Sequence, residues 1–276
     1  MLYRGMDRAQ LDTAYNNLAA VPAHPKLFAD WARRSARFRG WHHGYLNLAY
    51  GERPRERLDL FLAANPAAPT LAYIHGGYWQ MPFQTKETYS TLAEGALSHG
   101  LNVAMVEYTL APEARMDLIV DEVHQAIGWL HEHLGDYGAD GERLYVAGHS
   151  AGGHLTAMAM PLSAVKGGIA ISGVYDLEPI RLNCLNEKLG LNEAEARRNS
   201  PMRNFPPSAA PLIVACGTAE LPELRRQSTG YAEAWAEHGL PGHLLAIDGA
   251  DHFTILETLA QPDGALMQAL LILARG

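Results

Sequence analysis

The chain is poor in the residues that build covalent or metal-based frameworks. Among its 276 residues there are two cysteines, Cys184 and Cys216, which is too few for a disulfide framework. We expect two unpaired thiols in a cytoplasmic protein, with a single disulfide between them as the alternative. There is no His-Glu-x-x-His pattern and no Cys/His ligand spacing, so we expect neither a metal site nor a cofactor.

Long apolar runs and excess positive charge are also lacking. No run approaches the roughly 20 apolar residues of a membrane span, and the first residues carry no apolar core of a signal peptide. The net charge is −8, from 22 basic and 30 acidic residues. Such a surface repels phosphate backbones and anionic lipids, so we expect a small-molecule substrate and neither nucleic acid nor membrane as a partner.

The composition is that of an ordinary globular protein, with 48% hydrophobic and 19% charged residues. A chain of this length is near the upper limit for one hydrophobic core, so we expect a single domain over 1–276. Residues 1–40 form an N-terminal helical segment in this interpretation, broken by Pro22 and Pro25. Residues 175–207, rich in Asn, Pro, Arg and Glu, are either a small lid over the ligand crevice or a plain surface excursion.

Short apolar runs alternate with amphipathic stretches from residue 70 onward. This rhythm predicts βαβ units, and therefore a mostly parallel central sheet covered by helices on both faces. The predicted strands are 44–48, 57–62, 70–74, 101–106, 144–147, 168–172, 211–216 and 243–247. The predicted helices are 86–98, 116–134, 151–160, 222–238 and a closing helix after His252.

The pattern Gly148-His149-Ser150-Ala151-Gly152 follows an apolar strand and opens a helix. That context is typical of the nucleophile turn of α/β-hydrolases, in which a strained bend exposes the serine hydroxyl. The glycines two residues to either side let neighbouring backbones pass closely. The sequence therefore predicts Ser150 as a nucleophile, and a plain helix-capping serine is the alternative.

A second glycine-rich stretch, His75-Gly76-Gly77-Tyr78-Trp79, follows the strand that ends at residue 74. In this fold such a loop supplies N–H groups to the oxyanion hole, together with the N–H after the nucleophile. The predicted donors are Gly77, Tyr78 and Ala151, with Gly76 as a further one. We interpret His75 as structural, holding the loop by ring hydrogen bonds. Tyr78, Trp79 and His149 are the predicted substrate-pocket residues, and a place in the core is the alternative for Tyr78 and Trp79.

A serine nucleophile needs a base and an orienting carboxylate, which in this fold follow in the order serine, acid, histidine. His252 stands after the last predicted strand, in a small-residue loop that lets it reach Ser150. Glu220, beyond the strand 211–216, is the predicted acid. Asp248 is the alternative acid, whereas Asp176 follows a strand too early in the order.

The two glycine-rich motifs together resemble the kynurenine formamidase (arylformamidase) branch of the α/β-hydrolases, which borders the hormone-sensitive-lipase-like esterases. Residues 6–17 resemble its N-terminal helix, and residues 220–228 resemble its acid-bearing segment, where Asp is frequent and Glu stands here. The resemblance implies hydrolysis of N-formyl-L-kynurenine or a similar aryl formamide. The family analogy also suggests a homodimer, which no stretch of the sequence demonstrates.

Two other functions remain open at this stage. A short-acyl carboxylesterase would use the same Ser-His-Glu triad and acyl-enzyme, and would accept acetyl and butyryl groups. A non-catalytic ligand receptor on a hydrolase scaffold would have lost its nucleophile or base, and both are present in this chain.

Overall fold

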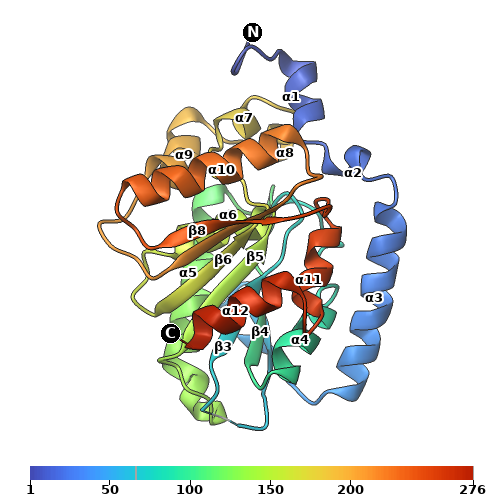
Figure 1. The fold of residues 1–276 in the computed structure, drawn as a ribbon, viewed down its shortest axis with the longest axis vertical. Helices are drawn as coiled ribbons and strands as arrows, with labels where there is room; N and C mark the ends of the chain where they lie inside the picture. The colour runs from blue at the N-terminus through green and yellow to red at the C-terminus, as the bar shows by residue number, and fades with distance from the viewer. Residues whose placement is uncertain (66, 276) are drawn as a thin grey trace.

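A single eight-stranded sheet dominates the computed structural model, which describes residues 1–65 and 67–275 (Figure 1). Its order within these residues is β1-β2-β4-β3-β5-β6-β7-β8. The β1–β2 and β2–β4 pairs are antiparallel, and all later pairs are parallel. The strands are β1 (Tyr45–Ala49), β2 (Arg57–Phe61), β3 (Thr70–Ile74), β4 (Asn102–Val106), β5 (Leu144–His149), β6 (Val165–Ile171), β7 (Leu212–Gly217) and β8 (Gly242–Ile247).

The central strands are buried on both faces because successive side chains point to opposite sides of the sheet. In β3, Leu71 and Tyr73 pack into one hydrophobic cluster, whereas Ala72 and Ile74 pack into the other. Both sets are apolar, which explains why the strand is a continuous hydrophobic run with no alternation. The predicted α/β-hydrolase sheet, mostly parallel and covered on both faces, is confirmed.

Two layers of helices cover the sheet (Figure 1). One contains α3, α4, α11 and α12, and the other contains α5, α6 and α10. The α-helices are α1 (Arg8–Ala14), α2 (Asn17–Ala20), α3 (His24–Trp41), α4 (Ala93–Ser98), α5 (Met116–His133), α6 (Ala151–Ala159), α7 (Glu178–Arg181), α8 (Asn186–Leu189), α9 (Glu193–Arg198), α10 (Pro222–Glu237), α11 (Glu257–Ala260) and α12 (Ala265–Arg275). Short 3₁₀ turns are η1 (Ser90–Leu92), η2 (Leu134–Tyr137), η3 (Pro201–Arg203) and η4 (Thr254–Leu256).

The predicted helix 86–98 is too long at its start. Only η1 and α4 form within it, because the residues before them bond to other parts of the chain. The backbone N–H of Lys86 donates to Glu107 at 3.1 Å, and its ammonium donates to buried Asp59 at 2.8 Å. These long-range bonds hold residue 86 in a turn, which the local sequence pattern does not reveal.

Three helices form in the N-terminal segment, whereas breaks at Pro22 and Pro25 predict two helical pieces, and α3 begins next to Pro25. Proline fits the first turn of a helix because its missing N–H would have no partner there. Residues 175–207 carry α7, α8, α9 and η3. Cys184 is exposed and Cys216 is buried, and both are unpaired as predicted. Among the described helices, none is both long enough and apolar enough to cross a membrane.

Candidate active site

The turn between β5 and α6 holds Ser150 in a strained conformation, with φ 57° and ψ −115°. Two close backbone approaches explain the flanking glycines. A Cβ on Gly148 would lie 2.3 Å from the carbonyl oxygen of Gly152, and one on Gly152 would lie 2.0 Å from that of Ile74. The N–H of Ser150 donates to Ile171 at the end of β6, at 2.8 Å. Contacts with β3 on one side and β6 on the other therefore hold Ser150 in this strained conformation.

A continuous line of hydrogen bonds joins the three predicted catalytic side chains, Ser150, His252 and Glu220. Nε2 of His252 lies 3.1 Å from Oγ of Ser150, and Nδ1 of His252 lies 2.9 Å from Oε2 of Glu220. All three residues are at most 6% exposed. The structure thus brings a hydroxyl, an imidazole and a carboxylate into the relative positions that nucleophilic acyl transfer requires.

The carboxylate of Glu220 is held firmly on its other oxygen. Oε1 accepts hydrogen bonds from Oγ of Ser172 at 2.7 Å and from the N–H of Gly217 at 2.6 Å. Ser172 was not identified from the sequence, although it is a polar residue directly after β6, between the strands that carry Ser150 and Glu220. Because Ser172 binds Oε1 of Glu220, the other oxygen, Oε2, is the one that bonds to His252.

The other candidate acids lie elsewhere. Asp248 is exposed and accepts a hydrogen bond from Oγ1 of Thr218 at 3.1 Å. Asp251 accepts from the N–H groups of Phe253 and Thr254, which shapes the loop that carries His252. Asp176 forms an ion pair with Arg203 at 3.1 Å.

The predicted oxyanion donors come together beside Ser150. A Cβ on Gly76 would lie 3.3 Å from the Cβ of Ser150, so this loop lies against the nucleophile. Within residues 1–65 and 67–275, the N–H groups of Gly77, Tyr78 and Ala151 have no hydrogen-bond acceptor. The N–H of Ala151 is the first of α6, and free N–H groups beside a helix N-terminus suit a developing negative charge.

The ring of His75 holds this loop in place by hydrogen bonds. Its Nδ1 lies 2.7 Å from the carbonyl oxygen of Gly76, and its Nε2 lies 2.7 Å from Oε1 of Glu107. Burial raises the pKa of Glu107, but His75 and Arg55 outweigh it and lower that pKa to about 2. The ring of His75 also stacks on Tyr108 at 4.4 Å. This is the structural role predicted for His75.

A narrow cavity of about 20 Å³ opens beside Ser150. Tyr78 and His149, two of the predicted substrate-pocket residues, line it. Trp79 does not, which corrects the prediction: its side chain is 1% exposed and packs edge-on against His154 at 5.2 Å. Both Tyr78 and Trp79 have positive φ, at 52° and 59°. This tight turn directs the indole into the core, an effect that the sequence pattern does not reveal.

The ring of His149 connects the turn at Ser150 to the loop that carries His252. Its Nε2 donates to the carbonyl oxygen of His252 at 2.6 Å. Complete burial, with a smaller contribution from His252, lowers the pKa of His149 well below its ordinary value. His149 is therefore neutral and holds the backbone of His252 in position.

The sequence analysis missed the residues that close the cavity from the N-terminal segment. Leu18, from α2, and Phe28, from α3, line it. The ring of Phe28 meets that of Phe253 edge-on at 5.0 Å, next to the base. The hydroxyl of Tyr78 donates to the carbonyl of Tyr15 and accepts from the N–H of Asn17, both at 3.0 Å. Residues far apart in the sequence carry no local signal for such contacts.

The insertion 175–207 does not supply the residues around Ser150. Asn183, Cys184 and Leu185 line a neighbouring cavity of about 180 Å³, which shares Leu18, Tyr78 and Met81 with the first.

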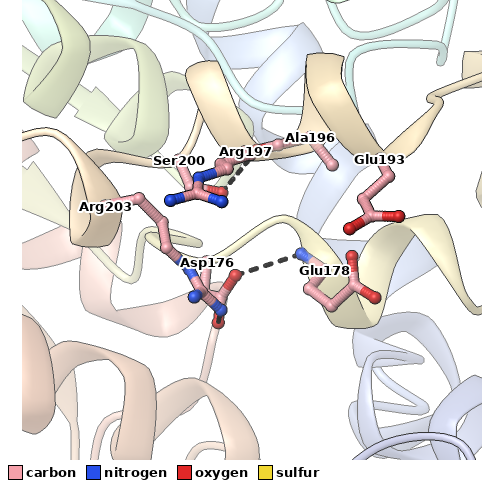
Figure 2. Close-up of a pocket in the computed structure, with 7 residues that line it drawn as sticks. All are labelled: Asp176, Glu178, Glu193, Ala196, Arg197, Ser200 and Arg203. Atoms are coloured by element: carbon pink, nitrogen blue, oxygen red, sulfur yellow. Dashed lines mark hydrogen bonds and ion pairs between the residues drawn. The ribbon is translucent and has the colours of Figure 1, made fainter.

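Another cavity, of about 240 Å³, lies within the insertion itself (Figure 2). Asp176 lies beside Arg203 there, whereas the carboxylates of Glu178 and Glu193 lie near each other, away from the guanidinium groups. In the described part of the chain, no cluster of three or more histidine, cysteine or acidic side chains could hold a metal ion.

Comparison with known proteins agrees with this fold. A family described as alpha/beta hydrolase fold matches residues 71–205. A kynurenine formamidase of Salmo salar is 35% identical over 85% of this chain and 83% of its own, and one of Danio rerio is 34% identical over 82% and 80%. A crystal structure from Silicibacter sp. TM1040, provisionally described as a thioesterase, is 32% identical with a TM-score of 0.84, covering 95% of this chain and 99% of its own. The chain is a hydrolase and belongs to the kynurenine formamidase family of the α/β-hydrolase fold.

Proposed function

We propose that this hydrolase cleaves aryl formamides, such as N-formyl-L-kynurenine, into formate and the free arylamine. The observation that carries the proposal is the hydrogen-bonded line from Ser150 through His252 to Glu220 beside a cavity of about 20 Å³. The 35% identity to a kynurenine formamidase over most of both chains supports the choice of substrate class.

The reaction follows from the roles of the three side chains. Oγ of Ser150 attacks the formyl carbon while Nε2 of His252 takes its proton, and Glu220 stabilises the imidazolium that forms. The N–H groups of Gly77, Tyr78 and Ala151, with Gly76 as a further donor, bind the oxyanion. His252 then gives the proton to the leaving nitrogen as the C–N bond breaks, which leaves a formyl ester on Ser150. Water activated by His252 hydrolyses this ester to formate.

The size of the cavity supports a formyl group over longer acyl groups. A cavity needs about 10–15 Å³ to hold one water molecule, so the space beside Ser150 is close to that of a single small group. Each added methylene has to displace packed side chains, and overpacking costs about 1–3 kcal/mol. We therefore expect kcat/KM to fall steeply beyond a short acyl chain.

A short-acyl carboxylesterase is the second candidate. It is favoured by the likeness to a plant enzyme, the probable isoprenylcysteine alpha-carbonyl methylesterase ICMEL1 of Oryza sativa, which is 26% identical over 75% of this chain and 56% of its own. The same triad would serve it, with acetyl or butyryl in place of formyl.

Steady-state kinetics on N-formyl-L-kynurenine, beside p-nitrophenyl esters of increasing acyl length, separate the two candidates. We expect the formamide to give the highest kcat/KM and the ester series to fall beyond acetyl. A series that rises out to octanoyl would overturn the proposal.

The nucleophile is tested on its own by Ser150→Ala, which should lower kcat by about 10⁴ to 10⁶ while the circular dichroism spectrum is unchanged. A serine-directed phosphonate should label Ser150. Label on another serine would assign the nucleophile elsewhere.

Three further expectations stay proposals: a single domain, which rests on the chain length, a cytoplasmic location, which rests on the two unpaired thiols, and a homodimer, which rests on the family resemblance. Sedimentation equilibrium tests the homodimer, and we expect the mass of a dimer at micromolar concentration.

A further inference from the structure

The side chain of Gln84 lies directly against the oxyanion loop. It is 2% exposed and lines the same cavity as Ser150 and His252. A Cβ on Gly77 would lie 2.8 Å from the Cβ of Gln84, so the two segments are in close contact. The N–H of Gln84 donates to the carbonyl of Met81 at 3.1 Å, in a turn that fixes where the side chain starts.

The carboxamide of Gln84 has unused hydrogen-bonding capacity. Its Oε1 is buried and has no hydrogen-bond partner among the described residues. Proteins satisfy the large majority of buried polar atoms, so an amide oxygen without a partner, on a residue that lines the cavity of Ser150, suggests that a ligand supplies the donor.

The chemistry of amide cleavage requires such an acceptor. When the tetrahedral intermediate collapses, the lone pair of the leaving nitrogen has to face Nε2 of His252 to receive the proton. The remaining N–H of the formamide then points away from His252 and needs an acceptor elsewhere in the cavity. The leaving oxygen of an ester carries no hydrogen and makes no such demand.

We propose that Oε1 of Gln84 accepts a hydrogen bond from the N–H of the scissile formamide, which makes Gln84 a specificity-determining residue that favours formamides over formate esters. This inference rests on the proposed function. It adds a contact that forms with one substrate class and cannot form with the other, which is how a site discriminates between near-isosteres.

Two substrates that differ only at the leaving atom test the proposal: formanilide, with a leaving nitrogen, and phenyl formate, with a leaving oxygen. The quantity measured is the ratio of kcat/KM for formanilide to that for phenyl formate, after subtraction of the uncatalysed rates. We expect Gln84→Met to lower this ratio on the order of tenfold, the loss of one hydrogen bond. Gln84→Ala also removes the acceptor without adding bulk, so the test stands if the methionine variant fails to fold.

The controls separate a contact from a change in packing. Gln84→Glu keeps an acceptor oxygen and should hold the ratio within about threefold of the original protein. Gln80→Met is the matched control, because Oε1 of Gln80 is likewise buried and unpartnered among the described residues but Gln80 does not line the cavity. We expect this variant to leave the ratio unchanged.

An equal loss on both substrates, or a ratio that is unchanged in Gln84→Met and Gln84→Ala, would overturn the inference about Gln84. Failure of the proposed function is seen separately in the unmodified protein, as hydrolysis of phenyl formate without hydrolysis of formanilide or N-formyl-L-kynurenine.

Discussion

At the scale of single residues, Glu220, the proposed acid, is distinguished by its hydrogen-bond partners and not only by its place in the chain. Glu220 uses one carboxylate oxygen for Ser172 and Gly217 and the other for His252. An acid held in this way keeps the imidazole in the tautomer that can accept a proton from Ser150.

Glu220→Gln should therefore lower kcat by about 10⁴, because the amide no longer enforces this tautomer. The matched control is Asp248→Asn, at an exposed carboxylate that contacts Thr218. We expect Asp248→Asn to lower kcat on N-formyl-L-kynurenine far less than Glu220→Gln does. The reverse order of losses would assign the acid to Asp248.

At the scale of elements, the N-terminal segment lines the cavity beside Ser150, and hydrogen bonds from Tyr78 hold it in that position. The hydroxyl bonds to Tyr15 and Asn17, on either side of the turn between α1 and α2. Burial raises the pKa of Tyr78 to about 12, so this hydroxyl keeps its proton across the working pH range. Leu18, one residue beyond Asn17, thereby covers the cavity beside Ser150.

Tyr78→Phe should loosen this segment without unfolding the sheet. Two lost hydrogen bonds of about 1 kcal/mol each predict a fall in kcat/KM of up to roughly thirtyfold, at about 1.4 kcal/mol per factor of ten. Amide hydrogen exchange should quicken over residues 8–20 and stay unchanged in β5. Tyr45→Phe, at a tyrosine that is 47% exposed on the edge strand β1, is the control and should change neither readout. Unchanged exchange in Tyr78→Phe would mean that other contacts hold the segment.

At the scale of the whole molecule, two neutral histidines are enclosed in the centre of the fold. Burial lowers the pKa of His149 well below its ordinary value and that of His154 to about 4. His154 donates to the carbonyl of Asn199 at 2.7 Å, which ties α6 to the insertion. Neither ring can take up a proton near pH 6 without an energetic cost to the folded state.

We therefore expect the free energy of unfolding to fall as pH is lowered from about 6.5 toward 4. Over that window the unfolded chain binds protons at these histidines and the folded chain does not. Between pH 6.5 and 5, His154 alone accounts for about 2 kcal/mol, at roughly 1.4 kcal/mol per pH unit. Denaturant unfolding at several pH values measures this. The variant His154→Gln cannot titrate and should show a weaker pH dependence, and an identical slope would contradict the assignment.

The sequence by itself determined the class of fold and most of the reactive groups. Gly148 to Gly152 after an apolar strand, and the paired glycines after His75, are local patterns because one short turn performs each role. Strand and helix periodicity likewise depends on neighbours a few residues away, which is why the parallel sheet could be predicted.

Only the tertiary structure decided what surrounds those groups. Ser172, Gln84, Leu18 and Phe28 reach the site from segments that are distant in the sequence, and each is an ordinary residue in its local context. Trp79 turned into the core because two successive positive φ angles redirect its side chain. Such outcomes depend on the free energy of packing the whole chain, which no local window of sequence contains.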